Sequence, residues 1–305
     1  MRISSAQLYN SSVGGMLDQQ AQVSKLQEQL SSGKRITQAS DDPIGAMQSQ
    51  ALTSTISQYD QYGRNMTSAQ NSLELSSSTL TAVVDNIQNI RQLLVQANNG
   101  SQTDSSRAAI ATELRSDLDG LMQLANTQDS SGAYIFSGTR QDQAAYVQDA
   151  SGNYVYQGND AQRSVNIGPA RTVATNVTGG DIFGSGSSSL MSLVNGIASA
   201  LQAPQTAATS ATLQQTLADG LNGLDSAMTQ VSNAQTAVGT RLNAIDQQNT
   251  INGDTSVQFK SMLSQVQDLD YASAITQFNL QMTGLQAAQQ AYTKIQGLSL
   301  FNYMQ

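Results

Sequence analysis

The stretch 52–94, LTSTISQYDQYGRNMTSAQNSLELSSSTLTAVVDNIQNIRQLL, carries an apolar residue at every seventh position. The members of this first stripe are Leu52, Tyr59, Met66, Leu73, Leu80, Ile87 and Leu94. A companion stripe keeps a three- or four-residue offset and consists of Ile56, Tyr62, Ala69, Ser76, Val83, Ile90 and Ala97. This spacing predicts one α-helix with both stripes on the same face, weakest at Ser76. A helix of roughly 65 Å needs partners along its length.

Further amphipathic segments supply those partners. A second strict heptad stripe consists of Leu224, Val231, Val238 and Ile245, with Met228 and Leu242 between them, and Gln235 interrupts their companion stripe. A shorter helix is expected to begin near Thr103, after the stop at 98–100, and its apolar face consists of Leu114, Leu118, Leu121 and Ala125. The charged residues that flank the seam of a solitary two-stranded coiled coil are missing. We therefore expect a coiled-coil-like bundle within one chain, which then packs against neighbouring subunits.

Both ends of the chain repeat the helical pattern in narrower stripes. The residues predicted to mediate assembly are Val23, Leu26, Leu30, Ile275, Phe278, Met282, Leu285 and Tyr292. Each stripe alone would bury too little apolar surface to offset the entropy lost on ordering. We expect the N- and C-terminal helices to pair, and to fray in the free monomer.

The middle of the chain has a different character. Short strands and turns are expected at 134–136, 146–147, 154–156, 164–167 and 172–175, with a hairpin turn at 151–153. The Gly-rich runs 179–181 and 184–189 are expected to be linkers, because neither has the Gly-Lys-Ser/Thr ending of a phosphate loop. The predicted fold is mainly α with a small β insertion, an elongated rod of long antiparallel helices.

Three domains follow from this pattern. A terminal helical assembly domain is expected at 1–42 with 265–305, a helical rod domain at 43–131 with 190–264, and a β-rich insertion domain at 132–189.

Composition excludes several classes of function. Charged residues make up 12% of the chain and its net charge is −8, without a basic run, which argues against nucleic acid and against anionic membrane surfaces. Cys and His are absent, and with them disulfides, the commonest general base and the commonest metal ligands. We expect no catalytic, cofactor-binding or metal site. An enzyme acting through the β insertion and a cytoplasmic coiled-coil scaffold are the competing classes.

The segment 32–46, SGKRITQASDDPIGA, is the most specific motif. Gly33 is predicted to end the first helix, and Asp42 followed by Pro43 is predicted to start the long one as N-cap and first-turn residue. Asp41 and Asp42 could alternatively form an acid/base or metal pair. Adjacent side chains generally diverge, however, and a third ligand is missing.

This motif, together with the opening 1–4, resembles the N-terminal region of flagellins and their hook-associated relatives. The motif residues are Gly33, Arg35, Asp41, Asp42 and Pro43. Flagellins typically continue the double Asp with Ala-Ala-Gly, whereas Pro-Ile-Gly-Ala at 43–46 is similar to the flagellar hook-associated protein 3 family. The segments 132–138, 156–160, 180–183 and 299–304 resemble the same family.

The resemblance implies a structural subunit of the bacterial flagellum, needed for motility, that self-assembles at the hook–filament junction. It also implies an extracellular location after type III export without a cleaved signal peptide, which agrees with an N-terminus that has no apolar core and cleavage site. The implied partners are copies of the chain in a ring, the hook-side junction protein, flagellin, the export apparatus, and an export chaperone that binds about Ile275 to Tyr292. A flagellin-type filament subunit is the alternative.

Overall fold

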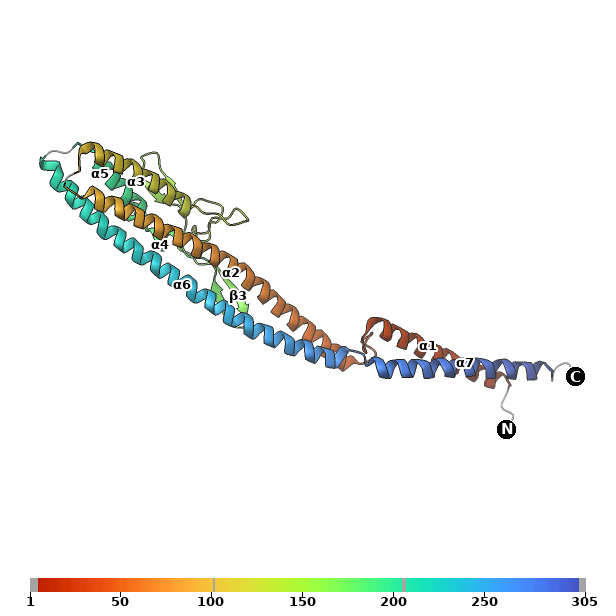
Figure 1. The fold of residues 1–305 in the computed structure, drawn as a ribbon. Coiled ribbons are helices and arrows are strands. Elements are labelled where there is room, and N and C mark those ends of the chain that lie inside the picture. The colour runs from red at the N-terminus through yellow and green to blue at the C-terminus, as the bar shows by residue number, and fades with distance from the viewer. Residues whose placement is uncertain (1–4, 101, 205–206, 302–305) are drawn as a thin grey trace. The chain divides into compact units, whose positions relative to one another are not determined.

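A computed structural model describes residues 5–100, 102–204 and 207–301 (Figure 1). Contacts divide the chain into two units, Met1–Gln58 with Asp254–Gln305 (unit 1) and Tyr59–Gly253 (unit 2). Two long helices, α2 (Pro43–Ala97) and α6 (Ala207–Gln267), contribute residues to both units. The three-domain division expected from the sequence stays a prediction. Among the described helices, none combines the length and apolarity needed to cross a membrane.

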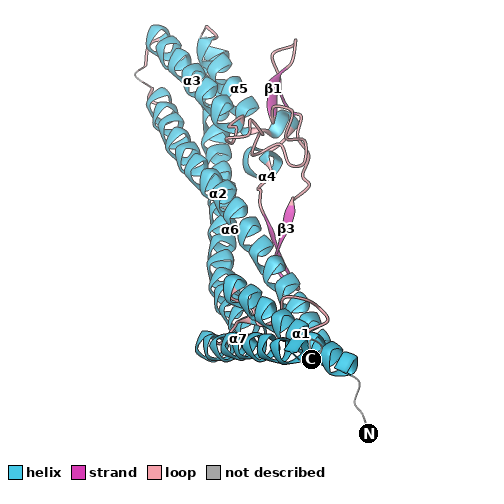
Figure 2. Cartoon of the chain, turned by 90° about the vertical axis from the view of Figure 1, so that its right-hand side faces the viewer, coloured by secondary structure: helices cyan, strands magenta, loops and turns pink. Residues whose placement is uncertain are grey.

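Unit 2 is built on the parts of α2 and α6 that lie side by side (Figures 1 and 2). The predicted heptad residues form their buried contact, with Leu73, Leu80 and Ile87 on α2 and Val231 and Val238 on α6 fully covered. Ser76, the weak point of the pattern, is also buried, and its hydroxyl donates a 2.8 Å hydrogen bond to the carbonyl of Ser72. A polar residue is tolerated in this seam because its hydrogen bond is satisfied by its own helix.

A second helical layer covers this pair in unit 2. It consists of α3 (Asp104–Ala125) and α5 (Leu190–Gln202), which pack closely on each other (Figure 1). The predicted start of α3 is confirmed, because the Thr103 hydroxyl accepts a hydrogen bond from the Ser106 amide at 3.2 Å. Helix α5 was not distinguished from the sequence as a separate element. Its signal is an apolar stripe that directly follows the Ser-rich run, Leu190, Met191, Val194, Ile197, Ala198 and Leu201.

The β insertion consists of two separate antiparallel hairpins. Strands β1 (Tyr146–Gln148) and β2 (Tyr154–Tyr156) form one, and β3 (Ser164–Gly168) and β4 (Arg171–Ala174) form the other. The turn predicted at 151–153 connects the first pair, with Gly152 at a φ of 85°. The prediction of a mainly helical chain with a small β insertion is confirmed.

Two local predictions in this region were wrong. Residues 134–136 do not form a strand: Tyr134 makes an isolated bridge with Gln128, and Phe136 is buried in a turn against the ring of Phe183. Residues 179–181, expected to be linker, begin helix α4 (Gly179–Phe183), which Thr178 caps, whereas the run 184–189 leads back into helix as expected and contains the short 3-10 helix η1 (Gly186–Ser188). In both places tertiary packing of aromatic side chains overrides local propensity.

Unit 1 contains the two terminal helices. Helix α1 (Ser5–Ser32) and helix α7 (Tyr271–Phe301) pack along each other, as predicted (Figure 1). The motif residues 1–4 and 302–304 lie outside the described residues, and the predicted fraying of the termini stays a prediction.

Candidate assembly site

Two connections between helices lie against each other in unit 1. One is the motif segment between α1 and α2, and the other is the turn between α6 and α7. Lys34 and Asp268 form an antiparallel β-bridge, in which the Arg35 amide donates to the Gln267 carbonyl at 2.7 Å and the Leu269 amide donates to the Gly33 carbonyl at 3.0 Å. This bridge, which we call the connector bridge (Gly33–Arg35 with Gln267–Leu269), joins residues from opposite ends of the chain.

Arg35 extends the connector bridge with its side chain. Its Nη2 atom donates to the Val266 carbonyl at 2.8 Å and lies 3.2 Å from Oδ2 of Asp42. A cation near the last carbonyls of α6 complements the negative end of the helix dipole. The same guanidinium therefore ties the end of α6 to the cap of α2.

Asp42 is the N-cap of α2, as predicted. Its Oδ1 atom accepts a 2.9 Å hydrogen bond from the Gly45 amide, and Pro43 occupies the first helical position. The Gly45 amide, and after it the Arg35 guanidinium, hold the pKa of the Asp42 carboxyl below its usual range. The cap is therefore ionised at neutral pH, as an acceptor at a helix start prefers.

Asp41 has separate partners. Its Oδ1 atom lies 2.7 Å from Nζ of Lys25 on α1, and its Oδ2 atom accepts hydrogen bonds from Thr37 and Gln38. The Lys25 ammonium is the main cause of a lowered pKa for this carboxyl. The two adjacent carboxylates thus point to different groups. Within the described ranges, no cluster of three or more His, Cys, Asp or Glu side chains could hold a metal ion.

Gly33 is required by two independent features of the connector bridge. Its φ is +70°, the left-handed region that a side chain rarely adopts. A Cβ atom placed on it would lie 2.9 Å from the hydroxyl oxygen of Tyr271, the first residue of α7. The glycine therefore ends α1 and also allows α7 to begin close to that end.

Asp270 is a capping residue of the candidate site that sequence reasoning missed. Its Oδ1 atom accepts from the amides of Ala272 at 3.0 Å and Ser273 at 3.3 Å, so it is the N-cap of α7. The signal was an Asp directly before an apolar periodic run, the same signal that identified Asp42. Helices α2 and α7 therefore each begin with an aspartate cap beside the connector bridge.

The predicted assembly residues lie along the α1–α7 pair. Val23 is buried and Ile275 is 48% exposed. The others are half-buried, namely Leu26, Leu30, Phe278, Met282, Leu285 and Tyr292. The structure thus places these residues on two adjacent helices, and their role in assembly stays a prediction.

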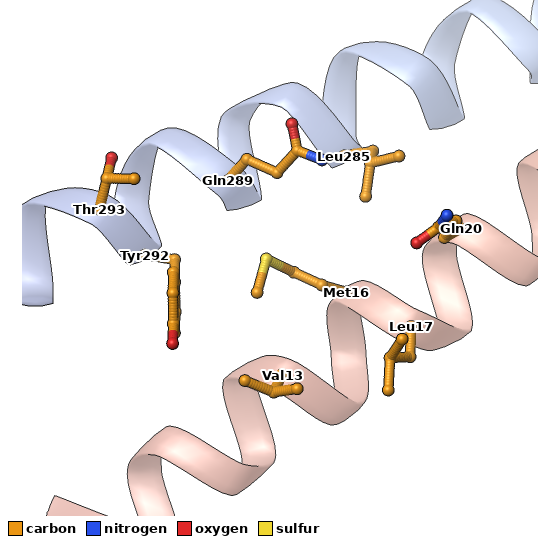
Figure 3. A pocket seen from close by; sticks show the side chains of 8 residues that line it. All are labelled: Val13, Met16, Leu17, Gln20, Leu285, Gln289, Tyr292 and Thr293. Carbon is orange, nitrogen blue, oxygen red and sulfur yellow. The ribbon is translucent and has the colours of Figure 1, made fainter.

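A groove of about 300 Å³ lies between α1 and α7 (Figure 3). Met16 of α1 and Tyr292 of α7 project towards each other across it, and Leu285 lies on the α7 side. Val13 and Leu17, which the sequence reasoning did not select, complete its apolar lining. The two terminal helices therefore contact each other without covering all of their apolar side chains.

Burial differs sharply between the two units. The large core cluster of buried residues lies in unit 2, whereas the buried hydrophobic residues in the described part of unit 1 are Val23, Ile36, Ile56 and Ala274. Most of the exposed large hydrophobic residues belong to unit 1, namely Leu17, Ile44, Met47, Val257, Met262, Tyr271, Ile275 and Leu280. Apolar surface left uncovered on this scale is typical of a protein–protein interaction surface.

We expect Gly33→Ala to weaken the connector bridge for two reasons. Alanine would have to adopt the positive φ, and its Cβ atom would lie too close to the Tyr271 hydroxyl. The cost of the φ alone is about 1–2 kcal/mol. Hydrogen exchange of the Leu269 and Arg35 amides measures the weakening of the bridge, and both amides should exchange faster than in the wild type. Gly33→Ala combined with Tyr271→Phe removes the hydroxyl contact but not the backbone strain, so it should recover only part of the loss. Unchanged exchange in both variants would show that the glycine is not needed.

We expect the start of α2 to lose stability in acid. The folded-state pKa of Asp42 is lowered, so the stabilisation is present above its unfolded pKa of about 3.9 and is lost as the pH falls through the lower, folded value. The measurement is the protection of the Gly45 amide between pH 2 and pH 7, corrected for its intrinsic exchange rate.

The variant Asp42→Asn keeps a capping oxygen but cannot ionise, so the protection of the Gly45 amide should vary less with pH in this variant. Asp60→Asn, at an exposed position farther along α2, is the matched control and should keep the wild-type profile. Parallel profiles for wild type and Asp42→Asn would contradict this role of the carboxylate.

Comparison with known proteins agrees with this architecture. Two family models match, the bacterial flagellin N-terminal helical region over residues 3–141 and the bacterial flagellin C-terminal helical region over residues 221–304. A solved flagellar hook-associated protein from Vibrio parahaemolyticus has a TM-score of 0.69 and 27% identity, and covers 75% of this chain and 100% of that one.

The lengths of the matches to two relatives distinguish between a flagellin and a hook-associated protein. Flagellin 1 of Proteus mirabilis is 30% identical over 120 residues, which are 39% of this chain and 33% of that protein. The flagellar hook-associated protein 3 of Salmonella typhimurium is 33% identical over 316 residues, which cover 99% of each chain. The resemblance predicted from the motifs is thereby confirmed, and the chain belongs to the flagellar hook-associated protein 3 family.

Proposed function

We propose that this chain is a structural subunit of the bacterial flagellum that forms the junction between hook and filament by self-assembly through its terminal helices. The observation that carries this proposal is the match to a hook-associated protein 3 over 99% of both chains. A flagellin-type filament subunit, the alternative, is supported over less than half of the chain. No residue is assigned a catalytic role in this proposal.

The burial pattern supports a mechanism based on assembly. Unit 2 has its own core, while unit 1 presents exposed apolar side chains such as Ile44, Met47 and Leu280. Each of these is 67–71% exposed, and covering such a side chain contributes about 1–2 kcal/mol. Docking against neighbours therefore supplies the burial that unit 1 lacks alone.

The partners in this proposal are copies of the chain in a ring, the hook-side junction protein on one side and flagellin on the other. The subunit leaves the cell through the flagellar type III export apparatus without cleavage. An export chaperone would cover the segment Ile275–Tyr292 before export. The exposure of Ile275 and Leu280 on α7 supports that role, because an amphipathic helix with an uncovered face is a common ligand of a partner groove.

The three-part division predicted from the sequence belongs to the same proposal. The terminal domain, 1–42 with 265–305, would provide the contacts with neighbours. The rod domain, 43–131 with 190–264, and the insertion, 132–189, would keep their folds in the free and assembled subunit. The contrast in burial between unit 1 and unit 2 supports this assignment.

Deletion of the gene from its source cell tests the junction role. We expect hooks without filaments in electron micrographs, and flagellin released into the medium, because filament subunits would have no base to assemble on. Reintroduction of the intact gene should restore filaments. Filaments of normal length in the deletion strain would overturn the proposal, and the loss of filament protein from both cell surface and medium would favour the flagellin alternative.

A single substitution tests the role of the α7 face. Ile275→Asp places a charge on an exposed apolar position, so the subunit should still fold but should support at least about tenfold fewer filaments per cell, the factor for roughly 1.4 kcal/mol. Thr276→Asp, at the adjacent exposed position, is the matched control and should restore filaments fully.

The amount of each variant in the medium separates export from assembly. Reduced export of Ile275→Asp would assign Ile275 to the chaperone or export step instead. Normal export together with normal filaments would remove Ile275 from the assembly surface.

A further inference from the structure

Two asparagines, one from each long helix of unit 2, bind neighbouring carbonyl groups of strand β3. Asn65 on α2 donates from Nδ2 to the carbonyl of Asn166 at 2.8 Å. Asn252 on α6 donates from Nδ2 to the carbonyl of Ile167 at 2.7 Å. Figure 2 shows β3 beside the two helices. One strand therefore holds a position on α2 and a position on α6 at the same time.

A β-bulge positions the second of these carbonyls. The β3–β4 ladder pairs Asn166 with Thr172 and Gly168 with Arg171, so Ile167 has no partner residue on β4. Its side chain is fully buried in the core of unit 2. A bulge leaves the extra residue outside the ladder, and here the Ile167 carbonyl binds Asn252.

The amide of Asn252 belongs to a chain of buried and half-buried hydrogen bonds that starts and ends on the hairpin. Arg171 on β4 donates from Nη1 to Oε1 of Gln248 at 3.2 Å, and Gln248 donates from Nε2 to Oδ1 of Asn252 at 2.8 Å. Gln248 and Asn252 are both buried on α6. Removal of one member leaves another buried polar group unsatisfied, so the chain of bonds acts as a unit.

The position of Asn252 in the heptad repeat is the reason this arrangement matters. The strict stripe Leu224, Val231, Val238 and Ile245 continues at 252 with a buried asparagine where an apolar residue would complete the pattern. A single buried asparagine in such a stripe fixes register at a cost in stability. Its Nδ2 atom also lies 4.0 Å from the sulfur of Met66 on α2, so it sits in the seam between the helices.

The apolar stripes alone do not define one axial alignment. If α2 moved by one heptad, about 10.5 Å, apolar residues would still face apolar residues. Neighbouring carbonyls of a strand are only about 3.3 Å apart, so Asn65 and Asn252 bind them together in one alignment only. A shift by a single helical turn, about 5.4 Å, already breaks one of the two bonds.

We propose that the β3–β4 hairpin is a register lock, in which Asn65 and Asn252 read consecutive carbonyls of β3 and thereby select one axial alignment of α2 and α6. Asn65 and Asn252 are specificity-determining residues of the fold in this sense. The proposal does not depend on the role of the chain in the flagellum.

Site-directed cross-linking tests the lock on the full chain, which contains no native cysteine. Gln235 on α6 lies opposite Thr81 on α2, with 3.5 Å between Nε2 and Oγ1. Cysteines at 81 and 235 therefore report the observed alignment with a short bifunctional thiol reagent. Cysteines at 88 and 235, or at 74 and 235, report α2 displaced by one heptad in either direction.

The decisive variant combines Asn65→Ala with Asn252→Leu, which removes both bonds and completes the apolar stripe. We expect the ratio of observed to displaced cross-links to fall at least about tenfold, the factor for roughly two ordinary hydrogen bonds, with helical content retained. Amides of residues 164–174 should exchange faster. Asn71→Ala with Asn249→Leu changes exposed asparagines of the same two helices and should leave the ratio unchanged.

The single variant Asn65→Ala covers the case in which the double variant does not fold. It leaves the bonds among Arg171, Gln248 and Asn252 in place, so displaced cross-links should appear while the hairpin stays protected. Absence of displaced cross-links in Asn65→Ala and, where it folds, in the double variant would overturn the lock. The apolar stripes would then set the register alone.

Discussion

Burial of the heptad stripes of α2 and α6 against each other is the interaction on which unit 2 depends. Helices as long as α2 and α6 would not stay ordered in isolation, because most helical stability in proteins comes from packing an apolar face. Here Leu73, Leu80 and Ile87 meet a matching stripe that contains Val231 and Val238, and all five are fully buried. The smaller helices α3 and α5 then extend the same core, and the hairpins attach to its side.

Ion pairs do not select this helix pairing. Among the described residues, the ion pair that joins α2 to α6 is Arg91 with Asp225, and both side chains are about half exposed. Exposed pairs of this kind contribute about 0–1 kcal/mol. Alignment must therefore come from shape and from polar side chains that bind the backbone. Asn65 and Asn252, each bound to the backbone of β3, are the groups placed to do so.

Unit 1 is held by a different kind of interaction. Its organising contacts are backbone hydrogen bonds of the connector bridge, the guanidinium of Arg35 and the aspartate caps of α2 and α7. These contacts are directional and define how the connections between helices run. They bury little apolar surface, so side chains such as Leu280 remain outside. Order in the connections and incomplete burial along the helices thus occur together in one unit.

Features set by local chemistry were predictable from the sequence, and features set by distant contacts were not. Gly33 as a helix end and Asp42 as a cap follow from neighbours within a few residues. The bond from Arg35 to Val266 spans 231 positions and has no local signature. Residues 134–136 resemble a strand locally, but Phe136 packs edge-on against Phe183, and Tyr146 does the same.

The same contrast between local chemistry and distant contacts applies to the candidate site. The stripes on α1 and α7 identified which helices pair, because apolar periodicity is a local property. They did not identify Val13 and Leu17 as groove residues, since which side of a narrow stripe faces its partner depends on the crossing of the two helices. Asn252, one heptad after Ile245, was not selected from the sequence, because its bond to the Ile167 carbonyl of β3 joins residues 85 positions apart and has no local signature.

The amide-rich composition connects the fold to assembly. Charged residues are 12% of the chain, and Gln, Asn, Ser and Thr occupy most of the exposed helical positions where a soluble helix usually carries Glu and Lys. Bringing charged faces together costs desolvation and like-charge repulsion, whereas uncharged polar side chains lose less and can exchange hydrogen bonds with water for bonds with a neighbour. Helices that carry an apolar stripe on one face and uncharged polar side chains on the others can therefore pack against neighbouring helices on several sides. A chain with these properties is suited to being surrounded by copies of itself and by related helical subunits.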